Sequence, residues 1–275
     1  MNRRTLFSIY FAAVMTITIA LMFTACRFST SPEESSWKIV WQDEFNGSAG
    51  TRIDSTRWSA GIGTGWGNNQ MEFDTDRPSN VSLDSTGCLA ITARKEFYGG
   101  QSYSSGRIST KGRFQFTYGR IEARIKLPSG QGIWPAFWML GANDDSITWP
   151  KCGEIDIMEL RGQLPNRING SAHGPDYSGS KAITKPYTLI NDRFDNRFHV
   201  FAVEWGANYV KYFVDDTLYQ TITPSTLAGP WVFNHPFYII LNLAVGGDYV
   251  GAPDGSTVFP QTMLVDYVRV YKEAQ

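Results

Sequence analysis

The chain has 275 residues, of which 42% are hydrophobic and 14% aromatic, and this is enough for one large domain with a sizeable core. Its 25 basic and 26 acidic residues leave a net charge of −1, which gives no electrostatic reason to expect nucleic acid as a partner. The three cysteines, Cys26, Cys88 and Cys152, lack the spacing of metal ligands. We expect Cys88 and Cys152 to be free, largely buried thiols, with a disulfide between them as the alternative.

Residues 1–25 are predicted to be an export signal, because a basic start is followed by a run without charge over residues 6–23. The small residues before Cys26 resemble a bacterial lipoprotein cleavage site. They predict a lipid-modified Cys26, a flexible tether over 26–36 and a location on the cell envelope. A retained membrane helix and cleavage by the ordinary signal peptidase are the alternatives, and both also place the rest of the chain outside the cytoplasm.

From residue 37 onward, short alternating runs are separated by Gly, Pro, Asn and Asp, and no long window has helical periodicity. This pattern is typical of an all-β sandwich or barrel. After a first strand at 37–45, residues 60–70 form a Gly-rich loop that contains Trp66 and Asn68. These side chains suit the edge of a cleft where amides bind hydroxyl groups, and a mobile surface loop is the alternative.

The next segments predict a series of strands in which the apolar side is buried. Residues 81–93 read as a hairpin, and residues 120–127 alternate between charged and apolar side chains, which predicts one wet and one core face. Residues 133–140 are apolar on both faces. Because Trp134 and Trp138 are four residues apart, they share a face, and we expect an exposed stacking platform for sugar rings, with burial in the core as the alternative.

The stretch GEIDIMEL places three carboxylates within six residues. On a strand, Glu154 and Asp156 point to the same face, whereas a regular pleat turns Glu159 to the opposite one. One extra residue, bulged out around Ile157 and Met158, brings Glu159 back to the face of the other two. We predict a bulged strand that carries three acids into one cleft, because like charges this close are costly unless they are used. A solvated edge strand is the alternative.

The remaining segments complete the predicted sandwich. Residues 169–174 look like the partner of the acidic strand, with His173 near the acids. A hairpin is expected over 198–214, with His199 in the core. Residues 237–245 read as a buried central strand, and a last strand closes the domain.

Two carboxyl groups that face a sugar chain can cleave a glycosidic bond, one as the ionised nucleophile and the other as the protonated acid. An acid between them, such as Asp156, would hold a proton in the cluster and raise the pKa of the proton donor. A metal site is the competing use of three acids. It is disfavoured because no His lies within ten residues of them and the bulge spreads the ligands.

The pattern Glu154-Ile-Asp156-Ile-Met-Glu159 resembles the signature of glycoside hydrolase family 16. The similarity extends over nearly all of residues 37–272, through six further segments that resemble the laminarinase branch of that family. These are WQDEF at 41–45, SGRI at 105–108, YGRIEARIKLP at 118–128, GIWPAFWML at 132–140, LNLAVGG at 241–247 and VDYVRVY at 265–271.

This resemblance implies an all-β, concanavalin-like jelly roll over residues 37–273, in which two curved antiparallel sheets form a sandwich with a concave substrate cleft. It maps the nucleophile onto Glu154, the family's Asp onto Asp156 and the acid/base onto Glu159. The positions that the resemblance assigns to sugar binding are Asn68, Arg107, Trp134, Trp138 and His173.

The bulged form of the acidic strand is shared by laminarinases, agarases and carrageenases. The sequence has no long inserted loops or dense basic residues of the kind that a sulfated substrate favours. The expected function is therefore retaining endo-hydrolysis of a neutral β-1,3-glucan of the laminarin type, and also of mixed β-1,3-1,4-glucan. The alternatives are a hydrolase of an algal galactan and a non-catalytic glucan-binding protein.

Many members of this family bind one Ca²⁺ on the convex side, away from the cleft. The resemblance implies the carboxylate of Asp266 and the backbone carbonyls of Glu44 and Gly87 as ligands, and hard oxygen donors suit Ca²⁺. The alternative is that Asp266 is simply a polar residue at a strand end. We expect the ion to stabilise the fold, with no catalytic cofactor. The expected partner is a polysaccharide bound by a monomer, with membrane contact only through a lipid anchor or signal segment.

Overall fold

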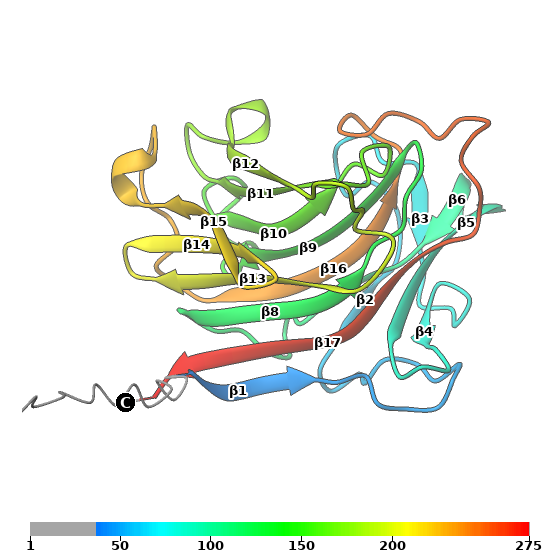
Figure 1. Ribbon diagram of the computed structural model, residues 1–275, viewed down its shortest axis with the longest axis horizontal. Helices are drawn as coiled ribbons and strands as arrows, with labels where there is room; N and C mark the ends of the chain where they lie inside the picture. Colours follow the sequence, from blue (N-terminus) through cyan, green and yellow to red (C-terminus); the bar gives the residue numbers. More distant parts are fainter. Residues whose placement is uncertain (1–36, 275) are drawn as a thin grey trace, which may run out of the picture. The chain divides into compact units, whose positions relative to one another are not determined.

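A computed structural model describes residues 37–274 and shows an all-β domain, as predicted (Figure 1). Within these residues the only helical parts are two short 3₁₀ turns, Gly179–Lys181 and Pro224–Thr226, and none is long and apolar enough to cross a membrane. The predicted export signal at 1–25, the lipidation of Cys26 and the tether at 26–36 lie outside the described residues.

The larger sheet has ten strands. They are β1 (Trp37–Asp43), β3 (Glu72–Asp74), β4 (Val81–Leu83), β5 (Leu89–Tyr98), β6 (Gln101–Ser105), β8 (Gly119–Lys126), β13 (His199–Gly206), β14 (Tyr209–Val214), β15 (Thr217–Ile222) and β17 (Gln261–Glu273). Eight of them follow the order β15-β14-β13-β8-β17-β5-β6-β3, while β1 pairs with β17 and β4 with β5. The pair β3 and β6 is parallel and so departs from the predicted antiparallel sheets, whereas the other strand pairs named here are antiparallel.

The smaller sheet has seven strands in the order β12-β11-β10-β9-β16-β7-β2. They are β2 (Ser59–Gly61), β7 (Arg107–Ser109), β9 (Ile133–Gly141), β10 (Glu154–Leu160), β11 (Arg167–His173), β12 (Ile183–Thr188) and β16 (Phe237–Val245). In Figure 1 the long central strands of both sheets curve in the same sense, with one sheet stacked over the other. This is the two-layer, curved sandwich that the sequence predicted.

The two-residue repeat of each strand divides its side chains between the core and the free face of the smaller sheet. In β9, Phe137 and Met139 belong to the buried core, whereas Trp134 and Trp138 line the cleft. In β16, Leu241 packs into the core and Asn242 faces the cleft. The core therefore lies between the sheets, and the site is built on the opposite face of the smaller one.

Several local predictions are confirmed. The β4–β5 hairpin pairs Leu83 with Leu89, and His199 is 1% exposed. Cys88 and Cys152 are free and buried. The first and last strands pair with each other in the larger sheet, where Trp37 lies opposite Glu273.

The placement of the core predicts the cost of truncating an aromatic ring. Phe137 is 0% exposed and Phe97, near the end of β5, is 81% exposed. Phe137→Ala is expected to lower the free energy of unfolding by about 3–5 kcal/mol because it leaves a cavity between the sheets. Phe97→Ala is expected to change it by less than about 0.5 kcal/mol. Urea unfolding followed by tryptophan fluorescence measures both, and equal losses would contradict this core.

Candidate active site

The free face of the smaller sheet carries a cleft of about 900 Å³. All eight residues predicted for catalysis or sugar binding line it: Asn68, Arg107, Trp134, Trp138, Glu154, Asp156, Glu159 and His173. Sequence reasoning missed other lining residues, namely Arg161, Asn169, Ser171, Thr184, Asn242, Asp248 and Tyr249. Asn242 had a signal that was overlooked, since it is the one polar residue in the apolar run FYIILNLAV.

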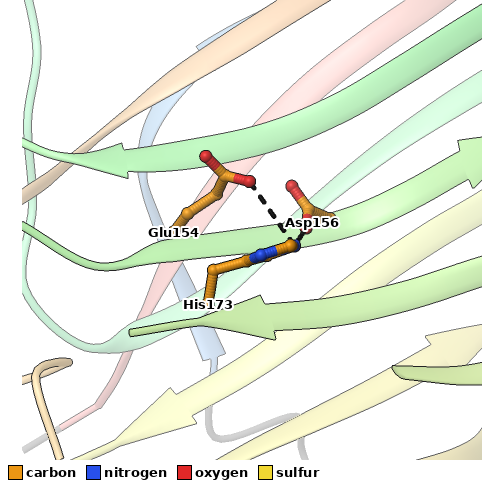
Figure 2. Close-up of side chains that lie close together, drawn as sticks. All are labelled: Glu154, Asp156 and His173. Carbon is orange, nitrogen blue, oxygen red and sulfur yellow. Dashed lines mark ion pairs between the residues drawn. The ribbon is translucent and has the colours of Figure 1, made fainter. Parts of the chain in front are cut away.

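His173 joins two of the acids, as Figure 2 shows. It lies opposite Glu154 in the β10–β11 pairing, and its Nε2 is 3.0 Å from Asp156 Oδ2 and 3.6 Å from Glu154 Oε1. The backbone N–H of Gly179 donates to Nδ1 at 3.1 Å. Nδ1 is therefore an acceptor, so the ring carries its hydrogen on Nε2, which faces the two carboxyl groups. The predicted proximity of His173 to the acids is confirmed.

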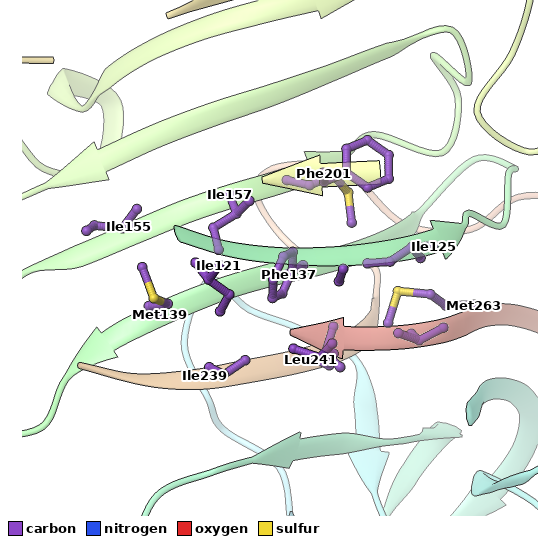
Figure 3. Close-up of a cluster of buried hydrophobic side chains, with 14 of the residues drawn as sticks. Ile121, Ile125, Phe137, Met139, Ile155, Ile157, Phe201, Ile239, Leu241 and Met263 are labelled. Carbon is purple, nitrogen blue, oxygen red and sulfur yellow. The ribbon is translucent and has the colours of Figure 1, made fainter. Parts of the chain in front are cut away.

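The predicted bulge is present and has a defined position. Asp156 pairs with Trp138 of β9, but the next paired residues are Met158 and Phe137, so Ile157 is the extra residue. Ile157 and Met158 are 1% and 0% exposed, and Figure 3 shows Ile157 among the core side chains between the sheets. Two consecutive side chains of β10 are thus buried, and Glu159 returns to the cleft face.

Trp134 is not the exposed platform that the sequence suggested. It is only 7% exposed, and its ring packs against Tyr249 with centroids 4.9 Å apart. Its Nε1–H donates to Glu159 Oε1 at 2.9 Å. Trp138 is the more open of the two indoles and donates to Asn242 Oδ1 at 2.8 Å. Trp134 therefore holds the third acid, and Trp138 keeps a face toward the cleft.

A second indole holds the first acid. Trp149 belongs to the loop between β9 and β10, and its Nε1–H donates to Glu154 Oε2 at 3.1 Å. Gly153, at φ +76, supplies the left-handed backbone that turns this loop into β10. The loop is fastened by Lys111, whose Nζ donates to Asp144 Oδ2 at 2.8 Å. Trp149 also forms part of the cleft wall, since it lines the cavity and is 48% exposed.

Burial controls the protonation of the three acids. It raises the pKa of Glu154 well above its ordinary value, with a further contribution from the charge of Asp156. Burial also raises the pKa of Asp156 to about 7. For Glu159, burial and then the Asp156 charge raise the pKa to about 8. The cluster therefore keeps protons at neutral pH, which a group that donates a proton to a substrate requires.

Glu154, Asp156 and His173 place potential ligand atoms within 4.8 Å of one another. The sequence argued against a metal partly because no His lies within ten residues of the acids. The pairing of β10 with β11 nevertheless brings His173 next to them. The tautomer set by Gly179, however, presents an N–H rather than a lone pair to the carboxyl groups. A metal ion would require the ring to give up this hydrogen. The arrangement favours proton sharing over metal binding.

The chain resembles known proteins over most of its length. Residues 59–268 match the family model described as "Glycosyl hydrolases family 16". A protein named beta-glucanase from Rhodothermus marinus is 38% identical over 252 residues, covering 88% of this chain and 87% of the relative. The laminarinase catalytic domain of Thermotoga maritima MSB8 is 44% identical with a TM-score of 0.82, covering 87% of this chain and 99% of that one. The endo-beta-1,3-glucanase of Pyrococcus furiosus is 45% identical with a TM-score of 0.81, covering 86% and 94%.

Of the residues expected to bind calcium, Asp266 lies on β17 of the larger sheet, Glu44 follows β1, and Gly87 lies in the turn between β4 and β5. Asp266 sits at a bulge of β17, and its charge acts on the thiol of Cys88, beside Gly87. Its carboxylate already pairs with Arg124 Nη1 at 2.6 Å. The residues fit a cation only in part, because the one charged ligand is shared with a guanidinium. Calcium binding stays a prediction.

If calcium binds, it should stabilise the domain without entering the reaction. Ca²⁺ is expected to raise the melting temperature by a few degrees relative to EDTA, because a ligand of the folded state shifts unfolding by mass action. Asp266→Asn should abolish this shift. Calorimetry of the two proteins with and without Ca²⁺ makes the measurement. Identical melting temperatures of the unmodified protein in Ca²⁺ and in EDTA would instead leave Asp266 with its ion pair to Arg124.

Proposed function

The chain belongs to glycosyl hydrolase family 16, and from this membership we propose that it is a retaining endo-β-1,3-glucanase acting on laminarin-type glucan. The relatives named beta-glucanase, laminarinase and endo-beta-1,3-glucanase support the substrate class. Mixed β-1,3-1,4-glucan is proposed as a second substrate. The galactan and non-catalytic alternatives are not favoured, because these close relatives are named for glucan hydrolysis.

The observation that carries the mechanism is that each catalytic Glu has its own indole donor. Trp149 donates to Glu154 and Trp134 donates to Glu159. A donor fixed on a carboxyl group holds it in one direction and stabilises its charged form. Two such groups on one face of a strand are the arrangement that a retaining glycosidase uses.

In the first step, Glu154 attacks the anomeric carbon as a carboxylate. The bond from this carbon to the glycosidic oxygen breaks, and Glu159 gives its proton to the departing oxygen. Asp156 lies beside Glu154 and can take up the proton that Glu154 must lose. His173 Nε2–H faces the same pair. The product of this step is a glycosyl ester of Glu154.

In the second step, Glu159, now ionised, removes a proton from a water molecule. The oxygen of that water attacks the anomeric carbon, and the ester bond to Glu154 breaks. Glu159 is protonated again, and the new hydroxyl has the anomeric configuration of the original bond. The raised pKa of Glu159 suits this exchange, because the group must hold a proton in one step and lose it in the other.

We also propose that the protein works outside the cytoplasm as a monomer. The leader that the sequence predicts supports export. A polysaccharide substrate also suits this location, because such a polymer would be met outside the cell. Lipidation of Cys26 is the finer proposal.

The roles of Glu154 and Glu159 are separated by azide. Glu154→Ala is expected to lower kcat by at least about three orders of magnitude, and azide should restore turnover with a glycosyl azide of inverted configuration, since it attacks from the vacated face. Glu159→Ala with azide should give the retained configuration. Product analysis by NMR on an aryl laminaribioside makes the comparison. An inverted azide from Glu159→Ala would mean that the two roles are exchanged.

The pH profile reports the proton on Glu159. The rate kcat/KM is expected to fall as pH rises through about 8, because Glu159 must be protonated. The negative charge of Asp156 raises the pKa of Glu159, so Asp156→Asn should lower that pKa and move the alkaline limb to lower pH. Asp248→Asn is the matched control, because Asp248 also lines the cleft but does not act on Glu159. A limb that moves equally in both variants, or upward in Asp156→Asn, contradicts the assignment.

A further inference from the structure

A second pair of buried acids lies outside the catalytic cluster. Glu72 and Asp74, two residues apart on β3, are 1% and 2% exposed. Within residues 37–274, Glu72 Oε1 and Asp74 Oδ1 have no hydrogen-bond partner. Burial raises the pKa of both carboxyl groups, that of Glu72 to about 7. Two incompletely paired buried acids reduce stability, and the proposed reaction uses neither of them.

The contacts of Glu72 explain its presence, since its Oε2 accepts the backbone N–H of Val245 at 2.8 Å and so joins β3 to the end of β16. The contacts of Asp74 go elsewhere. The indole N–H of Trp66 lies beside its carboxylate and lowers the pKa of that group. Its backbone N–H and carbonyl exchange hydrogen bonds with Gly63 at 2.7 and 3.0 Å. Asp74 therefore holds the Gly-rich loop at 60–70 by both its main chain and its side chain.

Trp66 links Asp74 to the side chains that line the cleft. The guanidinium carbon of Arg107 is 4.8 Å from the ring centre of Trp66 and 4.8 Å from that of Trp138, and all three side chains line the cleft. Among the acids that attract Arg107, Asp74 has the largest effect, and Glu154 is another. The indole rings of Trp66 and Trp138 and the guanidinium group of Arg107 thus form one wall of the cleft, near the nucleophile.

Strand β2, next to this wall, leaves room for its side chains. Gly61 of β2 lies opposite Arg107. A methyl group at that position would be 3.2 Å from Arg107 Cδ and 3.3 Å from Trp66 Cζ2. The absence of a side chain lets the guanidinium and the indole approach each other.

We propose that Asp74 is a positioning residue for substrate binding: its buried carboxylate fixes Trp66 and, through it, Arg107 as the sugar-contacting wall of the cleft. The inference rests on the proposed function for the identity of the sugar. Asp74 itself does not touch the substrate. Planar side chains held in advance lose less conformational freedom when a sugar ring stacks on them, so their fixation strengthens binding.

If Asp74 served only to stabilise the fold, replacing it would lower the melting temperature. Glu72, Arg107 and Trp66 are the groups that face Asp74. The raised pKa of Asp74 means that its contribution to stability is present below its unfolded pKa and is lost as pH rises through the folded value. Ionisation of Asp74 therefore costs the folded state stability. Asp74→Asn removes the charge at nearly constant shape, so it should leave the melting temperature unchanged or raise it.

The decisive experiment separates binding from turnover on laminarihexaose. Asp74→Ala is expected to raise KM about tenfold with kcat within about twofold, because the wall loosens while the catalytic acids stay in place. Asp74→Asn, which keeps an acceptor for the Trp66 N–H, should raise KM less. Isothermal titration in a Glu154→Gln background should show the same change in Kd. Unchanged KM and Kd in Asp74→Ala, or a loss of kcat with a lower melting temperature, would overturn the proposal.

Two further variants assign the effect to the link with Trp66. Trp66→Phe removes the indole donor, and combining it with Asp74→Ala should add nothing further to KM if the two residues act together. Glu72→Gln is the matched control, because it removes a buried charge from the same strand but keeps the bond to Val245. Its KM should stay within about twofold, and a rise equal to that of Asp74→Ala would refute the role of the Trp66 contact.

A measurement without substrate tests the positioning role of Asp74 independently of the proposed function. The indole N–H signal that disappears in Trp66→Phe identifies Trp66 in the NMR spectrum. Its hydrogen exchange should be at least about tenfold faster in Asp74→Ala, because the protecting bond is gone. If laminarin yields no new reducing ends with the unmodified protein, the proposed function fails. If laminarin is cleaved but the exchange rate and KM are unchanged, the positioning role fails.

Discussion

Taking carboxyl groups out of water raises the cost of their charges, and the cleft face of β10 does this to three of them at once. The structure offsets part of this cost with N–H groups from neighbouring segments. The indole of Trp134 on β9 donates to Glu159, and that of Trp149 in the loop before β10 donates to Glu154. The imidazole of His173 on β11 lies 3.0 Å from Asp156 Oδ2. The site therefore exists only where these segments surround β10 in the smaller sheet, and the order of its strands is part of its chemistry.

The bulge ties that chemistry to the core. Because Ile157 and Met158 are both buried, β10 is fixed by two successive side chains at the point where Asp156 and Glu159 diverge from a regular pleat. A slip of the strand by one residue would place acids between the sheets and isoleucines in water, which the hydrophobic packing opposes. The geometry of the carboxyl groups is thus maintained by residues that never meet a sugar.

The sequence predicted the strands, the bulge and the faces of the three acids, because each depends on a two-residue repeat visible within a few positions. It was less reliable where a contact joins distant segments. Trp134 looked like an exposed platform because the packing of Tyr249 against it leaves no local trace. The tautomer of His173 depends on the backbone of Gly179. No local pattern marks Asp74, and only the fold places it near Trp66.

The pairing of β1 with β17 has a topological consequence. Trp37 and Glu273 face each other in the larger sheet, whereas the sugar-binding side chains project from the free face of the smaller one. Both ends of the domain therefore leave it from the layer that does not bind the polymer. A glucan chain bound in the cleft lies against the other layer from Trp37 and Glu273. Joining the two ends and reopening the chain at a surface loop would leave the catalytic face undivided.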